Sequence, residues 1–175
     1  MTPGLVILLF ASAFASSTQA NSLGAPGCGP YDVQFDVKTS ENKNALPAPD
    51  SGKALVVFLQ DDARFGSRPR PTTRFGIDGT WVGATHSNSY FYVSVDPGAH
   101  HLCANWQSKV ILGQPSRPTA AMQFVAEAGK VYSFRARDFM DKDRPPAEVK
   151  LEAIDNDEAQ ILLNSFELSA SHPKK

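Results

Sequence analysis

The sequence predicts an all-β fold, an antiparallel β-sandwich of about eight strands with one α-helix near the C-terminus. The clearest indication is residues 75–107, where short alternating segments are separated by the turn signals Asp78-Gly79, Ser87-Asn88-Ser89 and Asp96-Pro97-Gly98. A second indication is that the apolar period of an amphipathic helix occurs convincingly only once, close to the end of the chain. A third is the pair of cysteines, which suits a small domain of an exported protein.

The N-terminal region has the character of an export signal. Residues 5–15, LVILLFASAFA, form an uncharged apolar run that is too short to span a bilayer and fits the central region of a signal peptide. We expect cleavage after Ala20, or alternatively after Ala15. Because no Lys or Arg precedes the run, the other interpretation is an uncleaved hydrophobic anchor. The predicted organisation is a signal peptide at 1–20, a flexible leader at 21–30, one β-sandwich domain at 31–168 and a disordered tail at 169–175.

The first elements of the domain follow from the spacing of apolar residues. Residues 31–38 alternate, which predicts a half-buried strand, and the polar, proline-containing stretch 39–52 predicts a loop. Residues 54–59, ALVVFL, form a continuous apolar run of strand length, which predicts a central strand. Residues 64–74 predict an exposed basic loop, because prolines 69 and 71 separate four arginines: Arg64, Arg68, Arg70 and Arg74.

The middle of the domain predicts consecutive strands. Residues 73–77 and 80–84 form a hairpin, since Asp-Gly accepts the positive φ angles of its turn. In residues 90–95, Phe91, Val93 and Val95 would face the core, while Tyr90 and Tyr92 would face the other way. Residues 100–106 return after the Pro-Gly turn, with Trp106 on the core face and Cys103 on the opposite face.

The last third predicts a further hairpin, one more strand and the helix. Residues 120–126 and 131–137 flank Ala-Gly-Lys and predict a hairpin, 138–147 predict a charged loop, and 149–154 predict a strand. Asp155 is placed as the N-cap of the helix, with Glu158 completing a capping box. The apolar face of this helix, with residues 159, 162, 163 and 166, is expected to cover a sheet edge or the open end of the sandwich.

Charge and cysteine content limit the function classes. A formal net charge of −1 does not favour nucleic-acid binding. Cys28 and Cys103 are most simply a disulfide, which would stabilise the fold by roughly 4 kcal/mol in the chain-entropy model. The alternatives are a reactive thiol and a metal site that shares His101 and Cys103, but the disulfide would consume the thiol that a metal needs. We expect no metal and no cofactor.

Catalytic patterns are weak. The chain contains no G-x-S-x-G motif, and the cluster of His86, Ser87, Ser89 and Asp96 is the kind that arises by chance in loops. The acidic pairs Asp61-Asp62 and Asp141/Asp143 are interpreted as solvated loop charges rather than paired catalytic carboxylates. His100 is expected to cap or pack against the Pro-Gly turn. We therefore expect no enzyme.

Two groups of residues are candidates for ligand contact. Tyr90 and Tyr92 would share a face that could stack on sugar rings or anchor a protein, and the alternative is that aromatic residues of this kind fill the core. Arg64, Arg68, Arg70 and Arg74 could meet an anionic partner such as a phosphate-bearing envelope polymer or an acidic protein, and the alternative is a solvated loop.

Three segments carry a resemblance to known proteins: DGTWVG at 78–83, SYFYVSVDPGAHHLCANW at 89–106 and FVAEAGKVYSFRAR at 124–137. They resemble the small bacterial β-sandwich domains of the PEGA type. From Cys28 to about Phe166 the chain is similar to an uncharacterised family of exported bacterial proteins related to those domains. The matching positions are turn glycines and core residues: Asp78, Gly79, Gly83, Pro97, Gly98, His100, Gly129 and Tyr132. The resemblance implies a cell-envelope or secreted module with no known catalytic residues.

Together these observations predict an exported, non-enzymatic β-sandwich module in the periplasm or outside the cell. Its role would be binding or structural, its partner an envelope component that is protein or glycan, and no transmembrane segment would remain after signal cleavage. The alternatives are a glycan-binding module that uses exposed aromatic residues, and a hydrolase.

Overall fold

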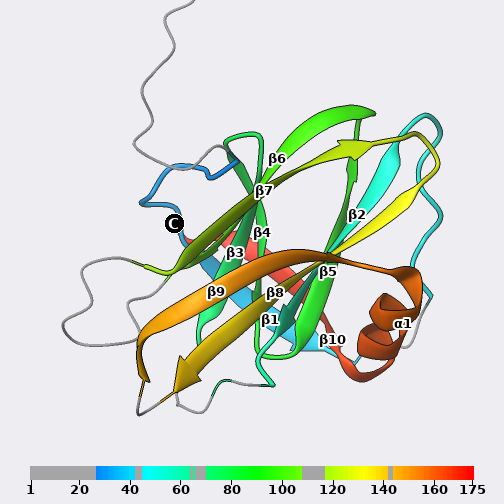
Figure 1. Cartoon of the computed structure of the whole chain (residues 1–175). Helices are drawn as coiled ribbons and strands as arrows, with labels where there is room; N and C mark the ends of the chain where they lie inside the picture. Colours follow the sequence, from blue (N-terminus) through cyan, green and yellow to red (C-terminus); the bar gives the residue numbers. More distant parts are fainter. Residues whose placement is uncertain (1–26, 42–44, 64, 66–69, 108–116, 142–143) are drawn as a thin grey trace, which may run out of the picture.

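The computed structural model describes residues 27–41, 45–63, 65, 70–107, 117–141 and 144–175. The described residues form two packed β-sheets and one short helix (Figure 1), with these elements in chain order: β1 Phe35–Ser40, β2 Ala54–Asp61, β3 Thr72–Ile77, β4 Thr80–His86, β5 Ser89–Val95, β6 Gly98–Trp106, β7 Thr119–Ala126, β8 Val131–Asp141, β9 Arg144–Ile154, α1 Asn156–Ser165 and β10 Glu167–Pro173. The predicted all-β sandwich is confirmed. The predicted signal peptide and most of the predicted leader lie outside the described residues.

The two sheets have different pairing patterns. The six-stranded sheet has the order β1-β10-β5-β2-β8-β9, and the four-stranded sheet has the order β4-β3-β6-β7. All pairs in the smaller sheet are antiparallel, whereas β8 runs parallel to β2, and β10 runs parallel to β5 over a short stretch. The fold is therefore a sandwich of largely, but not wholly, antiparallel strands.

The main core lies between the sheets and is rich in aromatic residues. The ring of Phe58 on β2 lies 4.8 Å from that of Phe75 on β3 and 5.4 Å from that of Phe91 on β5. Trp106 is buried in the same core, and every residue of β2 is buried. The predicted central strand and the predicted core positions of Phe91, Val95 and Trp106 are confirmed.

A second apolar cluster covers the other face of the six-stranded sheet. It contains Leu55, Val57, Leu59 and Tyr90, and the helix contributes Leu162 and Leu163 to its boundary. The N-cap prediction is confirmed, because the side chain of Asp155 accepts a hydrogen bond of 2.8 Å from the backbone N–H of Glu158. Helix α1 thus covers part of a sheet face, rather than the edge or open end that the sequence predicted.

Three other predictions were wrong. Residues 120–126 and 131–137 do not pair as a hairpin, because β7 joins β6 in one sheet and β8 joins β2 and β9 in the other. Residues 138–147 are not simply a loop, since β8 continues to Asp141 and β9 begins at Arg144. The tail at 169–175 is not disordered through its length, since β10 pairs with β1 along residues 168–173. Backbone pairing does not require apolar side chains, which explains why polar β10 gave no sequence signal.

No helix among the described residues has the length and apolar character needed to cross a membrane.

Candidate functional site: the N-terminal strap and the buried carboxyl pair

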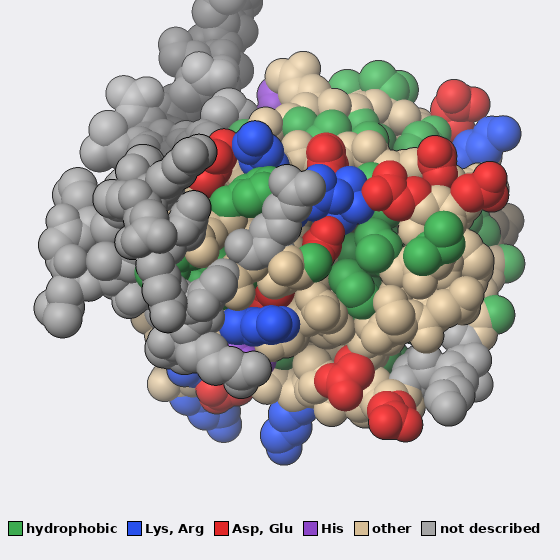
Figure 2. All heavy atoms as spheres, turned by 60° about the horizontal axis from the view of Figure 1, so that its bottom comes forward, with side chains coloured by type: hydrophobic (Ala, Val, Ile, Leu, Met, Phe, Trp, Pro, Cys, Tyr) green, Lys and Arg blue, Asp and Glu red, His purple; other side chains and the backbone are tan. Residues whose placement is uncertain are grey.

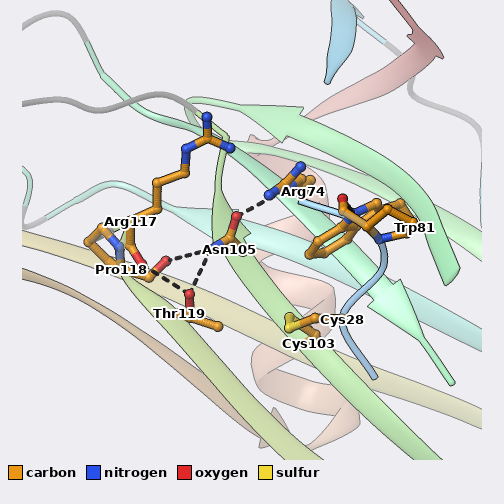
Figure 3. The surroundings of a disulfide bond; sticks show 9 residues. Cys28, Arg74, Trp81, Cys103, Asn105, Arg117, Pro118 and Thr119 are labelled. Carbon is orange, nitrogen blue, oxygen red and sulfur yellow. Dashed lines mark hydrogen bonds between the residues drawn. A yellow bond between two sulfur atoms is a disulfide. The ribbon is translucent and has the colours of Figure 1, made fainter. Parts of the chain in front are cut away.

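Residues 27–34, which we call the strap, lie against the outer face of the four-stranded sheet. Cys28 is disulfide-bonded to Cys103 on β6, with 5.0 Å between their Cα atoms, as the sequence predicted. Two glycines allow the close approach: a Cβ at Gly29 would lie 2.5 Å from the Trp81 ring, and a Cβ at Gly76 would overlap the carbonyl oxygen of Gly27. The strap is therefore held by a covalent bond and by backbone contact (Figure 3).

Arg74, on β3 of the four-stranded sheet, binds the strap through hydrogen bonds. Its side chain is fully buried, Nε donates a 2.9 Å hydrogen bond to the side-chain Oδ1 of Asn105, and Nη1 donates to the backbone carbonyls of Tyr31 and Val33. The guanidinium carbon also lies 4.2 Å from the centre of the Trp81 ring, close enough for a cation–π interaction. Figure 3 shows Arg74 between Asn105 and Trp81, beside the disulfide.

Burial lowers the pKa of Arg74. Desolvation, with a smaller contribution from the positive charge of Arg117, lowers its pKa to about 10. The side chain stays protonated at neutral pH because carbonyl oxygens, an amide and an aromatic ring replace the water it has lost.

This placement corrects the predicted exposed basic loop. Arg74 belongs to β3 and is inaccessible, and Arg70 is half-buried, with Nη1 4.0 Å from Oδ2 of Asp62. Arg64 and Arg68 lie outside the described residues. Local sequence could not reveal the burial of Arg74, because the acceptors that permit it lie more than 30 residues away.

Beside Arg74, three side chains form an accessible surface that we call the strap surface: Tyr31, Trp81 and Arg117. Tyr31 is 59% exposed, and the guanidinium carbon of Arg117 lies 4.3 Å from the centre of its ring. Trp81 is partly exposed and donates a 2.7 Å hydrogen bond from Nε1 to the Pro30 carbonyl. Within the described part of the chain, neither Arg74 nor Arg117 has an Asp or Glu oxygen within salt-bridge distance.

Other arginines of the domain differ in this respect. Arg135 donates to Glu152 at 2.6 Å and to Glu158 at 2.5 Å, and Arg137 donates to Asp61 at 3.2 Å. On the face shown in Figure 2, basic and acidic side chains are intermixed. Among the described residues, the strap surface is thus distinguished by having cations next to aromatic rings without a salt bridge, although Asp32 lies near enough to favour the charged form of Arg74.

The two predicted contact tyrosines do not form a common surface. Tyr90 is only 2% exposed, because its ring lies in the second apolar cluster that α1 covers, while Tyr92 is 37% exposed. The prediction that Tyr90 faces outward was wrong for a physical reason: the sequence pattern showed that Tyr90 points away from the main core, but the helix and its neighbours bury that face too.

His86, His100 and His101 have structural partners. His100 is held against the turn, as predicted, by contacts of 2.8 Å to the Asp96 carbonyl and 2.6 Å to the Asp78 carboxylate. Ser89 contacts the backbone of His86 through Oγ, rather than its ring. In the described residues no group of three or more His, Cys, Asp or Glu side chains gathers in a way that would hold a metal ion.

A second unusual site lies inside the sandwich and was missed by the sequence interpretation. Asp62, just after β2, and Asp138 on β8 are both fully buried, although Asp62 was interpreted as a solvated loop charge and Asp138 was placed in a charged loop. We call them the carboxyl pair. Gln60 donates to both carboxylates, at 2.9 Å each, through Nε2. The predicted strand ended before Gln60, so its role as the link between the two had no sequence signal.

Comparison with known proteins gives no relative: no family model matches the chain, and neither a curated protein nor a solved structure matches it. The resemblance to PEGA-type domains therefore stays a prediction.

Proposed function

We propose that the protein is an exported, non-enzymatic module of the bacterial cell envelope that binds an envelope component through the strap surface. The observation that carries the proposal is the disulfide that fixes the strap on the sheet. Structural disulfides persist in oxidising compartments, and here the disulfide holds Tyr31 beside Trp81 and Arg117. The apolar run at 5–15 supports export independently.

The chemistry of the strap surface favours an anionic partner. Tyr, Trp and Arg are the residues that most often supply binding energy in interfaces, and a guanidinium without a carboxylate partner suits a phosphate or carboxylate group. Because charges are intermixed on the face shown in Figure 2 and the formal net charge is −1, recognition would rest on a few local contacts rather than on a broad basic field. The alternative contact surface at Tyr90 and Tyr92 loses support, since Tyr90 is buried.

Export can be tested on protein recovered from its native host. We expect the intact mass to match a chain that begins after residue 20, and to increase by two hydrogens on reduction. We expect the protein in the periplasm or the medium. Alkylation before reduction should leave both cysteines unmodified. Full-length cytoplasmic protein with two alkylated cysteines would overturn the proposal.

Binding can be tested by co-sedimentation with isolated cell-wall material. We expect Tyr31→Ala and Arg117→Gln to lower the bound fraction, and Tyr92→Ala, which removes an exposed aromatic ring elsewhere, to leave it unchanged. Treating the wall with phosphatase or blocking its carboxyl groups would identify the anionic group. Equal binding by all three variants would refute the strap surface as the contact.

A further inference from the structure

The carboxyl pair lies at the centre of a polar cluster that connects the two sheets. Asp138 belongs to the six-stranded sheet and accepts hydrogen bonds from two residues of the four-stranded sheet, at 2.7 Å from Nε1 of Trp106 and at 3.2 Å from Oγ1 of Thr73. Gln60 on β2 accepts a 2.7 Å hydrogen bond from Oγ1 of Thr85 on β4. These three contacts cross the interior of the sandwich, where most of the other contacts are apolar.

Fully buried carboxyl groups that lie side by side are expected to share a proton. Two adjacent negative charges without water repel each other strongly, so one group keeps its proton and donates a hydrogen bond to the other. Both Oδ1 of Asp62 and Oδ2 of Asp138 lie 2.9 Å from the same amide nitrogen. In addition, Oδ2 of Asp62 is buried and accepts no hydrogen bond from any described residue.

We propose that the carboxyl pair is a proton-dependent lock between the two sheets. With at least one proton on the pair, Asp62 and Asp138 can hydrogen-bond to each other and keep Trp106, Thr73 and Gln60 in their cross-sheet contacts. Loss of that proton puts two negative charges in the interior and weakens the contacts that depend on their position.

The neighbouring basic groups do not offset the cost of two negative charges at the carboxyl pair. Among the described residues, the basic groups that face the pair are Arg70, with Nη1 4.0 Å from Asp62, and His86. Both favour the charged form of Asp62, but burial outweighs them and raises its pKa. Burial, followed by the charge of Asp62, raises the pKa of Asp138 well above its ordinary value.

The direction of the pH effect follows from proton binding. Since the pKa values of both carboxyls are raised above the ordinary 3.8, the folded protein binds more protons than the unfolded chain over the interval between 3.8 and the raised pKa values. The lock's contribution is therefore complete below pH 3.8 and is lost as the pH rises through the raised pKa of the pair. Within that interval the folding equilibrium constant should fall by up to about tenfold per pH unit for each proton.

The two tryptophans provide a direct test by proton NMR. The indole N–H of Trp106 donates to Asp138, whereas that of Trp81 donates to the Pro30 carbonyl. We expect the Trp106 signal to shift with a midpoint above pH 3.8 and the Trp81 signal to show no such shift. A Trp106 signal that is constant, or that titrates at or below pH 3.8, would overturn the proposal.

Variants separate the lock from other titrating groups. Asp138→Asn imitates the protonated form, because its amide can donate to Asp62. We expect it to remove the Trp106 titration and to lessen the fall of the folding equilibrium constant with pH, of which only the part due to the burial of Asp62 would remain. Asp36→Asn, on an exposed side chain, should change neither. If Asp138→Asn does not fold, carbon NMR titration of the two carboxyls in the natural protein decides: ordinary values for both would refute the lock.

Discussion

We expect removal of the disulfide to cause a large loss of folding stability, although it leaves the apolar core unchanged. Cys28 and Cys103 are 75 residues apart, and a cross-link over that separation removes enough freedom from the unfolded chain to stabilise the fold by about 4 kcal/mol. Cys28→Ala/Cys103→Ala should lose most of this. Alanine is the appropriate replacement because Cys103 is fully buried and a serine hydroxyl would lack a partner.

The assay is urea-induced unfolding followed by tryptophan fluorescence, with the free energy extrapolated to water for both proteins. Amide hydrogen exchange should also increase in residues 28–34, while the centre of β2 stays the most protected segment. A difference in unfolding free energy below about 1 kcal/mol would refute the reasoning, because it would mean that the cross-link restricts the unfolded chain far less than the chain-entropy model requires.

Three other substitutions test separate contacts. Gly76→Ala would place a methyl group against the Gly27 carbonyl and should lower the free energy of unfolding by about 1–3 kcal/mol, as measured by urea unfolding. In the variant that lacks both cysteines the loss should be smaller, because the strap can move away. Asp155→Ala removes the N-cap of α1 and should cost about 1 kcal/mol, so an unchanged urea midpoint would contradict the cap. For His100, burial opposes the charged form, but the hydrogen bond that its ring Nδ1 donates to the Asp78 carboxylate raises the pKa of His100 above 6.5. The stabilising contribution of this contact is complete below pH 6.5 and is lost as the pH rises through the raised pKa. Asp78→Asn should therefore lower the pKa of His100 found by NMR titration.

The sequence predicted features that depend on neighbouring residues. Asp78 and Gly79 have φ angles of 49° and 83°, as the hairpin turn requires, and the alternation through 90–95 placed Phe91 and Val95 in the core. Strand pairing was harder to predict. Alternation shows that β7 and β8 are strands but does not show whether they share a sheet, and that choice depends on β8 fitting beside β2, more than 70 residues earlier.

The buried charges could not be predicted for a related reason. A charged residue in an alternating pattern indicates a solvated face, unless partners from elsewhere satisfy it. Arg74 and Asp138 each obtain those partners from segments distant in sequence. Tyr90 was misplaced in the same way, because only α1 and the apolar residues around it make its face an interior one.

Arg74 and Asp138 both disfavour alternative strand registers. In β3, Thr73 and Phe75 point into the sandwich and Arg74 points toward the strap, so a slip of one residue would turn the guanidinium into the apolar core and Phe75 toward the strap. A slip of β8 would likewise remove Asp138 from Trp106, Thr73 and Gln60 and leave a buried carboxyl without its hydrogen bonds. Alternative registers are therefore penalised by buried polar groups without partners as well as by lost apolar contact, since an uncompensated buried charge such as that of Arg74 costs several kcal/mol. The strap and the carboxyl pair, which are the two candidate functional features, are for this reason also the places where the sheets are held in register.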